Sequence, residues 1–160
     1  MKTKTFKTVL SAFLLLLSMI SLQAQSATEE VDLLQSLYGM EKKSLISEFL
    51  GNSVNDSFWQ VYDTYEMERK ALGKERIDLL SNYVENYSEL QGDKADELIN
   101  KAERLNKKQN SLISKYTKKV RKVAGSEVAA QFYQVEHYLL SAVRAEIFEN
   151  IPFIGTLKID

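Results

Sequence analysis

The sequence predicts an all-α protein with about four helices, in which the second and third form a long antiparallel hairpin with flanking helices. Apolar residues recur at intervals of three and four, and no alternating strand-like stretch persists. Glycine (six residues) and proline (one) are both scarce. Internal helices of this length with tight connections must lie antiparallel to their neighbours.

Residues 1–24 have the pattern of a secretory signal peptide. Three lysines open the chain without a nearby acid, and residues 9–20 are almost entirely apolar. Twelve residues are too few to span a bilayer but suit the apolar region of a signal. We expect cleavage after Ala24, with Ala27 as a second possibility and an uncleaved anchor as the alternative reading. The absence of cysteine at the junction excludes a lipid-modified amino terminus.

The predicted mature chain, residues 25–160, is expected in the periplasm as one helical domain (25–150) with a short tail (151–160). It contains no cysteine, so no disulfide can stabilise it even in an oxidising compartment. Its stability must therefore come from a packed core, and one domain of this length can bury one.

The first predicted helix covers residues 29–50, and the second starts from a capping box at Ser53 and runs to about residue 88. The first has a possible break at Gly39 and stops at the sequence GNSVND. Ser53 with Asp56 three residues later forms a capping box that starts the second helix. The apolar residues expected on one face are Val31, Leu34, Leu37, Tyr38, Leu45, Ile46, Phe49 and Leu50 in the first helix and Phe58, Tyr62, Tyr65, Leu72, Leu79, Tyr83 and Tyr87 in the second.

The third and fourth predicted helices cover residues 93–124 and about 126–150. Gly125 suits a left-handed cap after the third helix, and Ser126 suits an N-cap for the fourth. Pro152 prevents the fourth helix from continuing. The apolar faces are expected to hold Leu98, Ala102, Leu105, Leu112, Tyr116, Val120 and Val123, and then Val128, Phe132, Val135, Leu139, Val143 and Ile147.

The stretch NDSFWQVYDTYEMERKAL, residues 55–72, concentrates aromatic side chains at the start of the second helix. Phe58, Tyr62 and Tyr65 fall on the apolar face, which favours packing against the first and fourth helices. Trp59 lies about 100° around the helix from Phe58 and widens this face. The alternative is an exposed recognition surface.

Charge is unevenly distributed along the chain. Residues 29–90 hold 13 acids and 6 bases, whereas residues 91–125 hold 4 acids and 10 bases. The basic residues of the third helix lie opposite its leucines, as in an ordinary solvated face near a helix carboxyl end. The functional alternative is an anion-attracting strip. Its candidate partner-binding residues are Lys115, Lys118, Lys119, Arg121 and Lys122, with Trp59 and Tyr87 as apolar contacts.

Four charged residues interrupt the apolar faces: Arg69 and Arg76 in the second helix, and Glu136 and Glu146 in the fourth. An unpaired charge in such a position would cost several kcal/mol. We therefore predict a partly buried network of structural ion pairs that links these two helices and fixes their register.

The chain lacks the residue patterns of common enzymes and metal sites. It has no cysteine nucleophile, no glycine-rich phosphate loop and a single histidine, His137. One histidine cannot build the usual zinc cluster, and no Glu-x-x-His pair is present for a two-metal bundle. We expect a non-enzymatic protein with no cofactor and no metal.

An exported, cysteine-free helical chain of this size resembles the periplasmic Spy/CpxP superfamily of stress-response chaperones and sensor modulators. Three segments stand where that family carries its Leu-Thr-x-x-Gln motif: LGNSVND (50–56), LQGDK (90–94) and VAGSEVAAQF (123–132). Gln91 occupies the threonine position and Lys94 the glutamine position. The resemblance implies a bent helical hairpin, often paired into a cradle-shaped homodimer.

The chain is also similar to small exported helical proteins of Gram-negative bacteria that share two patterns, FW-x-VY-x-x-Y-x-x-x-R and A-x-FYQ-x-E. The matching residues here are Phe58, Trp59, Val61, Tyr62, Tyr65 and Arg69, and then Ala130, Phe132, Tyr133, Gln134 and Glu136. This second resemblance implies no particular activity.

These observations lead to two functional hypotheses. The first is a chaperone-like or stress-adaptor protein that captures unfolded protein clients reversibly and without ATP. The alternative is a structural or adaptor module for one envelope or sensor protein, with residues 151–160 as its docking peptide. Neither involves nucleic acid, because the expected compartment and the net charge of −1 disfavour it. Contact with a membrane is expected only through the signal peptide.

Overall fold

The structure is a computed structural model of the chain that describes residues 38–150. These residues form a helix at 38–50, the short 3-10 helix η1 (Gly51–Ser53), helix α3 (Asp56–Asn86), the 3-10 helix η2 (Tyr87–Glu89) and helix α4 (Asp93–Asn150). The described part is thus helical and contains no strand, which confirms the all-α prediction there. The predicted signal peptide and tail lie outside the described residues.

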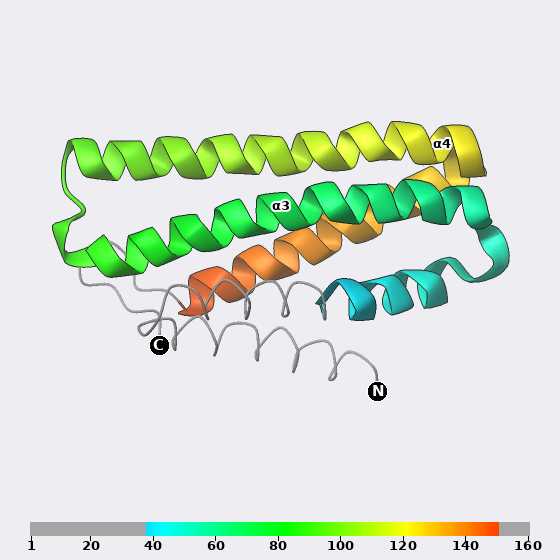
Figure 1. Cartoon of the computed structure of the whole chain (residues 1–160), viewed down its shortest axis with the longest axis horizontal. Helices are drawn as coiled ribbons and strands as arrows, with labels where there is room; N and C mark the ends of the chain where they lie inside the picture. The colour runs from blue at the N-terminus through cyan, green and yellow to red at the C-terminus, as the bar shows by residue number, and fades with distance from the viewer. Residues whose placement is uncertain (1–37, 151–160) are drawn as a thin grey trace.

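Helix α4 bends back on itself at Gly125. This residue has φ 86° and ψ 174°, a non-helical conformation that glycine reaches without strain from a Cβ atom. The bend divides α4 into a first arm (93–124) and a second arm (126–150), which run in opposite directions (Figure 1). The two arms correspond to the two helices that the sequence predicts on either side of Gly125.

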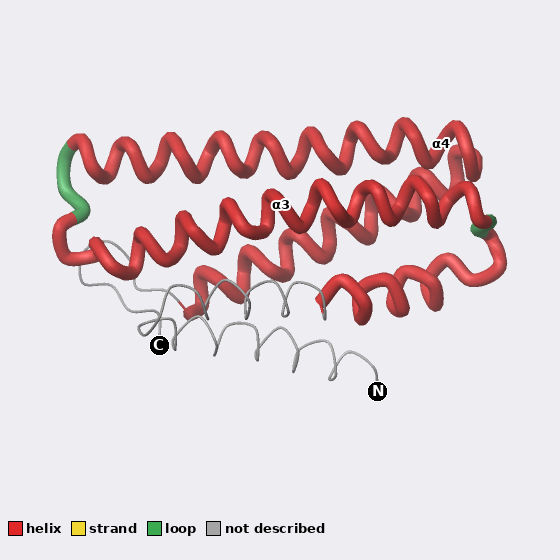
Figure 2. The backbone as a smooth tube through the Cα atoms, viewed as in Figure 1, coloured by secondary structure: helices red, strands yellow, loops and turns green. Residues whose placement is uncertain are grey.

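Helix α3 and the first arm of α4 form the predicted antiparallel hairpin, joined by a short connection (Figure 2). Gly92 in this connection has φ 53°, and its carbonyl oxygen accepts hydrogen bonds from the amides of Ala95 and Asp96. In Figure 1 the helix at 38–50 lies on the other side of α3 from the first arm, and the second arm of α4 passes behind α3 from the bend toward that side.

The start of α3 differs from the predicted capping box. The N-cap is Asn55, whose side-chain oxygen accepts a hydrogen bond of 3.0 Å from the amide of Phe58. Ser53 instead lies in η1. Asparagine is a strong N-cap residue, so it replaces the serine two positions earlier. The helical conformation also continues through Gly39, where the sequence suggested a break.

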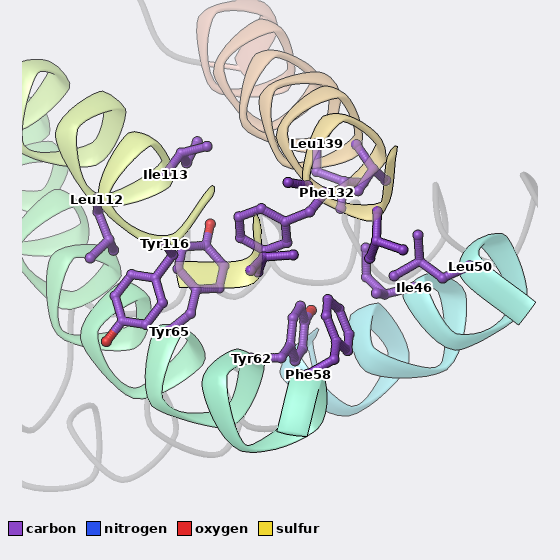
Figure 3. Packing of buried hydrophobic residues seen from close by; sticks show 14 residues of the cluster. Ile46, Leu50, Phe58, Tyr62, Tyr65, Leu112, Ile113, Tyr116, Phe132 and Leu139 are labelled. Carbon is purple, nitrogen blue, oxygen red and sulfur yellow. The ribbon is translucent and has the colours of Figure 1, made fainter. Parts of the chain in front are cut away.

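The hydrophobic core lies between the helix at 38–50, α3 and both arms of α4. Ile46, Phe58, Tyr116 and Phe132 meet there from these four segments and are completely buried (Figure 3). Phe58, Tyr62 and Tyr65 belong to this core, as the helical pattern predicts. Among the predicted core residues within 38–150, Phe49 differs because it is 49% exposed, and the predicted core residues Val31, Leu34 and Leu37 lie outside the described part of the chain.

Within residues 38–150, no helix combines the length and the apolar character that crossing a membrane requires.

Candidate functional site

Five polar residues form a buried ion cluster between the helix at 38–50, α3 and the second arm of α4. Lys42 Nζ donates to Glu66 Oε1 at 2.6 Å and to Glu136 Oε2 at 2.7 Å. The hydroxyl of Tyr65 donates to the same Glu136 oxygen at 2.6 Å. Arg69 Nε donates to Glu66 Oε2 at 2.8 Å. Three helical segments are therefore joined through one chain of charged hydrogen bonds.

The charges of the ion cluster balance, with two cations against two carboxylates. Lys42 and Glu136 are nearly inaccessible, at 1% and 2% exposed. Burial alone would raise the pKa of Glu66, but the charges of Lys42 and Arg69 outweigh burial and lower it. Burial raises the pKa of Tyr65, and the Glu136 carboxylate adds to the effect. The tyrosine therefore stays protonated and serves as a donor.

The four charged residues singled out from the sequence have different environments. Arg69 and Glu136 lie in the ion cluster but are linked through Glu66 and Lys42 rather than directly. Arg76 Nη2 donates to the side-chain oxygens of Asn106 at 2.8 Å and Gln109 at 2.7 Å, so amides take the place of the expected carboxylate.

Glu146, the fourth of these residues, is half-buried on the second arm of α4 and is not one of the five cluster residues.

Sequence reasoning missed Lys42, the central cation of the cluster. The available signal was its spacing: Lys42 lies four residues after Tyr38 and four before Ile46, on the face that also holds Leu50. A lysine within an apolar helical face is the same kind of exception that identified Arg69.

The basic strip of the first arm is partly neutralised by α3. Lys115 Nζ donates to both carboxylate oxygens of Glu68, at 2.9 and 2.7 Å. The Tyr116 hydroxyl also donates to Glu68 at 2.7 Å, and these hydrogen bonds lower the pKa of that carboxyl group. Lys119 lies over the ring of Tyr116, with its Nζ 4.3 Å from the ring centre.

The remaining strip residues, Lys118, Arg121 and Lys122, are exposed and form no ion pair with the described part of the chain. They are the cations of the strip that stay available to an external anion.

The two aromatic contact candidates, Trp59 and Tyr87, are both half-buried. Trp59 is half-buried, and its ring packs edge-on against Phe58 and Tyr62 at 5.0 and 5.6 Å between centres. Tyr87 is also half-buried and packs against Tyr83. Both rings therefore belong mainly to internal packing.

The second arm of α4 has an unusual distribution of charged side chains between buried and exposed positions. Glu127 and Glu149 are exposed near its two ends, but between them the charged residues are buried or half-buried and the exposed residues carry no charge. We call this exposed surface the uncharged face; its members are Ala130, Tyr133, Gln134, Tyr138, Ser141, Ala145 and Phe148. Tyr138 and Phe148 are 67% and 57% exposed. The helical periodicity of the sequence does not by itself identify this face, because the face depends on which side of the arm packs inward.

Among residues 38–150, no group of three or more His, Cys, Asp or Glu side chains is arranged to hold a metal ion. The ring of His137 packs against Tyr133, with 4.3 Å between ring centres. This contact gives His137 a packing role beside the uncharged face.

No family model, no curated protein and no solved structure matches the chain.

Proposed function

We propose that the protein is a non-enzymatic, chaperone-like or stress-adaptor protein of the periplasm that binds unfolded or partner proteins reversibly. In this proposal residues 1–24 are a cleaved signal peptide, and four helical segments form the mature domain. The proposal follows the resemblance to the Spy/CpxP superfamily in fold class, compartment and type of activity.

The uncharged face of α4 is the observation that carries this proposal. Protein interfaces are enriched in tyrosine, phenylalanine and methionine and are poor in charge at their centres. Tyr133, Tyr138 and Phe148 are exposed on the second arm, where the charged residues between the exposed Glu127 and Glu149 are buried or half-buried. Exposed apolar surface of this kind commonly marks a site for protein binding.

The basic strip supplies the second element of the proposed mechanism. Lys118, Arg121 and Lys122 are exposed and attract acidic segments over a distance of about 8 Å at physiological salt. Such attraction accelerates encounter more than it strengthens the final complex. The client would thus be recruited electrostatically and held by apolar contacts.

An aggregation assay with an unrelated unfolding protein at stoichiometric ratio tests the proposal. We expect the wild-type protein to delay aggregation and the variant Tyr138→Lys/Phe148→Lys to lose most of this effect. The matched control is Val84→Lys/Ile99→Lys, which adds the same charge at exposed apolar positions on α3 and the first arm. No delay by the wild-type protein, or equal loss in both variants, would contradict a role for the uncharged face in chaperone activity.

The alternative function is an adaptor for one envelope or sensor protein. The uncharged face favours it too, because one side of a single helical arm suits one complementary partner. A pull-down with and without residues 151–160 separates the two hypotheses: one strong partner that is lost on truncation supports the adaptor. A concentration-dependent dimer that Tyr138→Lys abolishes would instead assign the face to a homodimer.

A further inference from the structure

A cavity of about 90 Å³ lies between the helix at 38–50, α3 and the two arms of α4. Its walls are mainly aliphatic, with Leu72, Ile77, Leu112, Leu139, Val143 and Ile147 among them. A single water needs roughly 10–15 Å³ of such space, so the cavity has room for several methylene-sized groups. Apolar walls of this kind are a poor environment for water and a good one for a hydrocarbon chain.

Two arginines lie at the cavity without a matching anion. Arg76 is part of the wall, and its Nε is buried without a hydrogen-bond acceptor. Arg144 follows the wall residue Val143, and its Nε and Nη2 are likewise buried without an acceptor. Neither arginine forms an ion pair within residues 38–150. We call these two residues the arginine pair.

The two side chains are close enough for their charges to interact. Burial, together with the positive charge of Arg144, lowers the pKa of Arg76 to about 10. Burial also lowers the pKa of Arg144. A neighbouring carboxylate would have the opposite effect on both groups.

The ion cluster lines the opposite end of this cavity through Lys42, Tyr65, Arg69 and Glu136, and Glu136 Oε1 is buried there without a hydrogen-bond partner. Arg76 lies seven residues after Arg69, which places it about 10 Å further along α3. Arg144 lies eight residues after Glu136, or about 12 Å along the second arm. Glu136 is held by Lys42 and Tyr65. Within residues 38–150 no ion pair joins these carboxylates to Arg76 or Arg144, so this end of the cavity carries two positive charges without a paired anion.

We propose that this cavity binds a single-chain amphiphile with a carboxylate head, such as a medium-chain fatty acid. The carboxylate accepts hydrogen bonds from the free N–H groups of Arg76 and Arg144, and the alkyl chain occupies the aliphatic cavity. Guanidinium groups suit this role because their planar N–H groups match the two oxygens of a carboxylate. The site is separate from the uncharged face and does not depend on the proposed function.

Calorimetric titration of the purified protein with decanoate, below its micelle concentration, tests this site. We expect saturable binding of one decanoate, weaker binding of decanol and weaker binding of acetate, because the site uses both head and chain. Arg76→Gln/Arg144→Gln should weaken decanoate binding about tenfold or more, since charge-assisted hydrogen bonds are lost. The control variant Lys118→Gln/Lys122→Gln removes two exposed cations on the first arm of α4. Its affinity for decanoate should equal that of the wild-type protein.

A substitution that fills part of the cavity tests the site independently if the arginine variant folds poorly. Val143→Phe narrows the aliphatic space and should weaken binding of decanoate more than binding of hexanoate. Circular dichroism verifies that each variant retains its helices. The proposal is overturned if the wild-type protein does not bind decanoate, if decanol binds as tightly, or if the arginine variant binds decanoate unchanged. Binding of dodecyl phosphate without any binding of dodecanoate would overturn the assignment of a carboxylate head.

Discussion

The ion cluster and the arginine pair place cations in the same helical domain, but their surroundings differ. Lys42 and Arg69 contact two carboxylates and lie in a charge-balanced cluster. Arg76 and Arg144 have amide or aliphatic neighbours, and no ion pair reaches them from residues 38–150. Both groups interrupt apolar helical faces in the sequence.

This difference separates a structural role from a binding role. A balanced cluster satisfies its own charges and joins three helical segments, so its removal should disturb folding. An unbalanced pair stays costly in the free protein, so its removal should favour folding while it harms binding of an anion. Whether a substitution raises or lowers the free energy of unfolding therefore distinguishes the ion cluster from the arginine pair.

The largest effect is expected for Lys42→Met. This substitution leaves Glu66 and Glu136 buried without their shared ammonium group. Breaking a buried charge pair in this way costs about 3–5 kcal/mol. Urea unfolding followed by circular dichroism measures the loss.

The matched control for Lys42→Met is Lys43→Met, because Lys43 pairs with Asp63 at the exposed surface. Its cost should be about 0–1 kcal/mol. Equal losses in the two variants would show that the ion cluster has no special structural role.

Two neighbouring tyrosines provide the second test. Tyr65→Phe removes the hydroxyl that donates to Glu136 and should cost about 1.5–3 kcal/mol, as for hydrogen bonds to charged groups. Tyr62→Phe removes a buried hydroxyl that has no hydrogen-bond partner. Its stability should stay within about 0.5 kcal/mol of wild type or rise. The same urea experiment compares them, and a greater loss for Tyr62→Phe would contradict the assigned contacts.

Acid titration tests the balance of charge in the cluster. The folded pKa of Glu66 lies below its usual value of 4.5, so folding favours the carboxylate form. The corresponding stability is present above about pH 4.5 and is lost as the pH falls through the folded value. The difference in unfolding free energy between wild type and Glu66→Gln should therefore shrink as the pH drops below 4.5.

Carboxyl groups outside the ion cluster are present in both of these proteins, so their contributions cancel in the difference. A difference that grows on acidification would mean that the pKa of Glu66 is raised rather than lowered.

The opposite sign is expected for Arg144→Met. Removing two buried donors without acceptors should stabilise the free protein by about 1 kcal/mol. Arg104→Met, at an exposed position on the first arm, is the control and should change stability by less than about 0.5 kcal/mol. Destabilisation by Arg144→Met of 2 kcal/mol or more would indicate a partner that satisfies this arginine in the free protein.

The helices could be predicted from the sequence because their signals are local. The apolar spacing of Phe58, Tyr62 and Tyr65 and the glycine at 125 each depend on neighbouring residues only. The sequence predicts Ser53 rather than Asn55 as the N-cap of α3, because both residues have suitable side chains. Which of them caps the helix depends on the path of the chain through η1.

The site could be predicted only in part. Arg69 and Glu136 stood out within apolar faces, but their partners depend on the rotation and register of packed helices. The sequence predicts direct ion pairs between the arginines and glutamates, whereas Glu136 pairs with Lys42 and Arg69 pairs with Glu66. The uncharged face and the cavity depend on which side of the second arm turns inward. The hydrophobic spacing defines that side only approximately, since Glu136, Arg144 and Glu146 also turn away from solvent.

The smallest effect is expected for Lys115→Gln, which extends the comparison to a solvated cation. Lys115 contacts both oxygens of Glu68, as closely as Lys42 contacts its own carboxylates, but it is 50% exposed. Water and salt screen this pair, so the substitution should cost only about 0.2–1 kcal/mol. Unfolding in low salt and in 1 M salt measures the cost, which should nearly vanish at the higher concentration. A loss comparable to that of Lys42→Met, or one insensitive to salt, would mean that hydrogen-bond geometry and not burial decides what a lysine contributes in this protein.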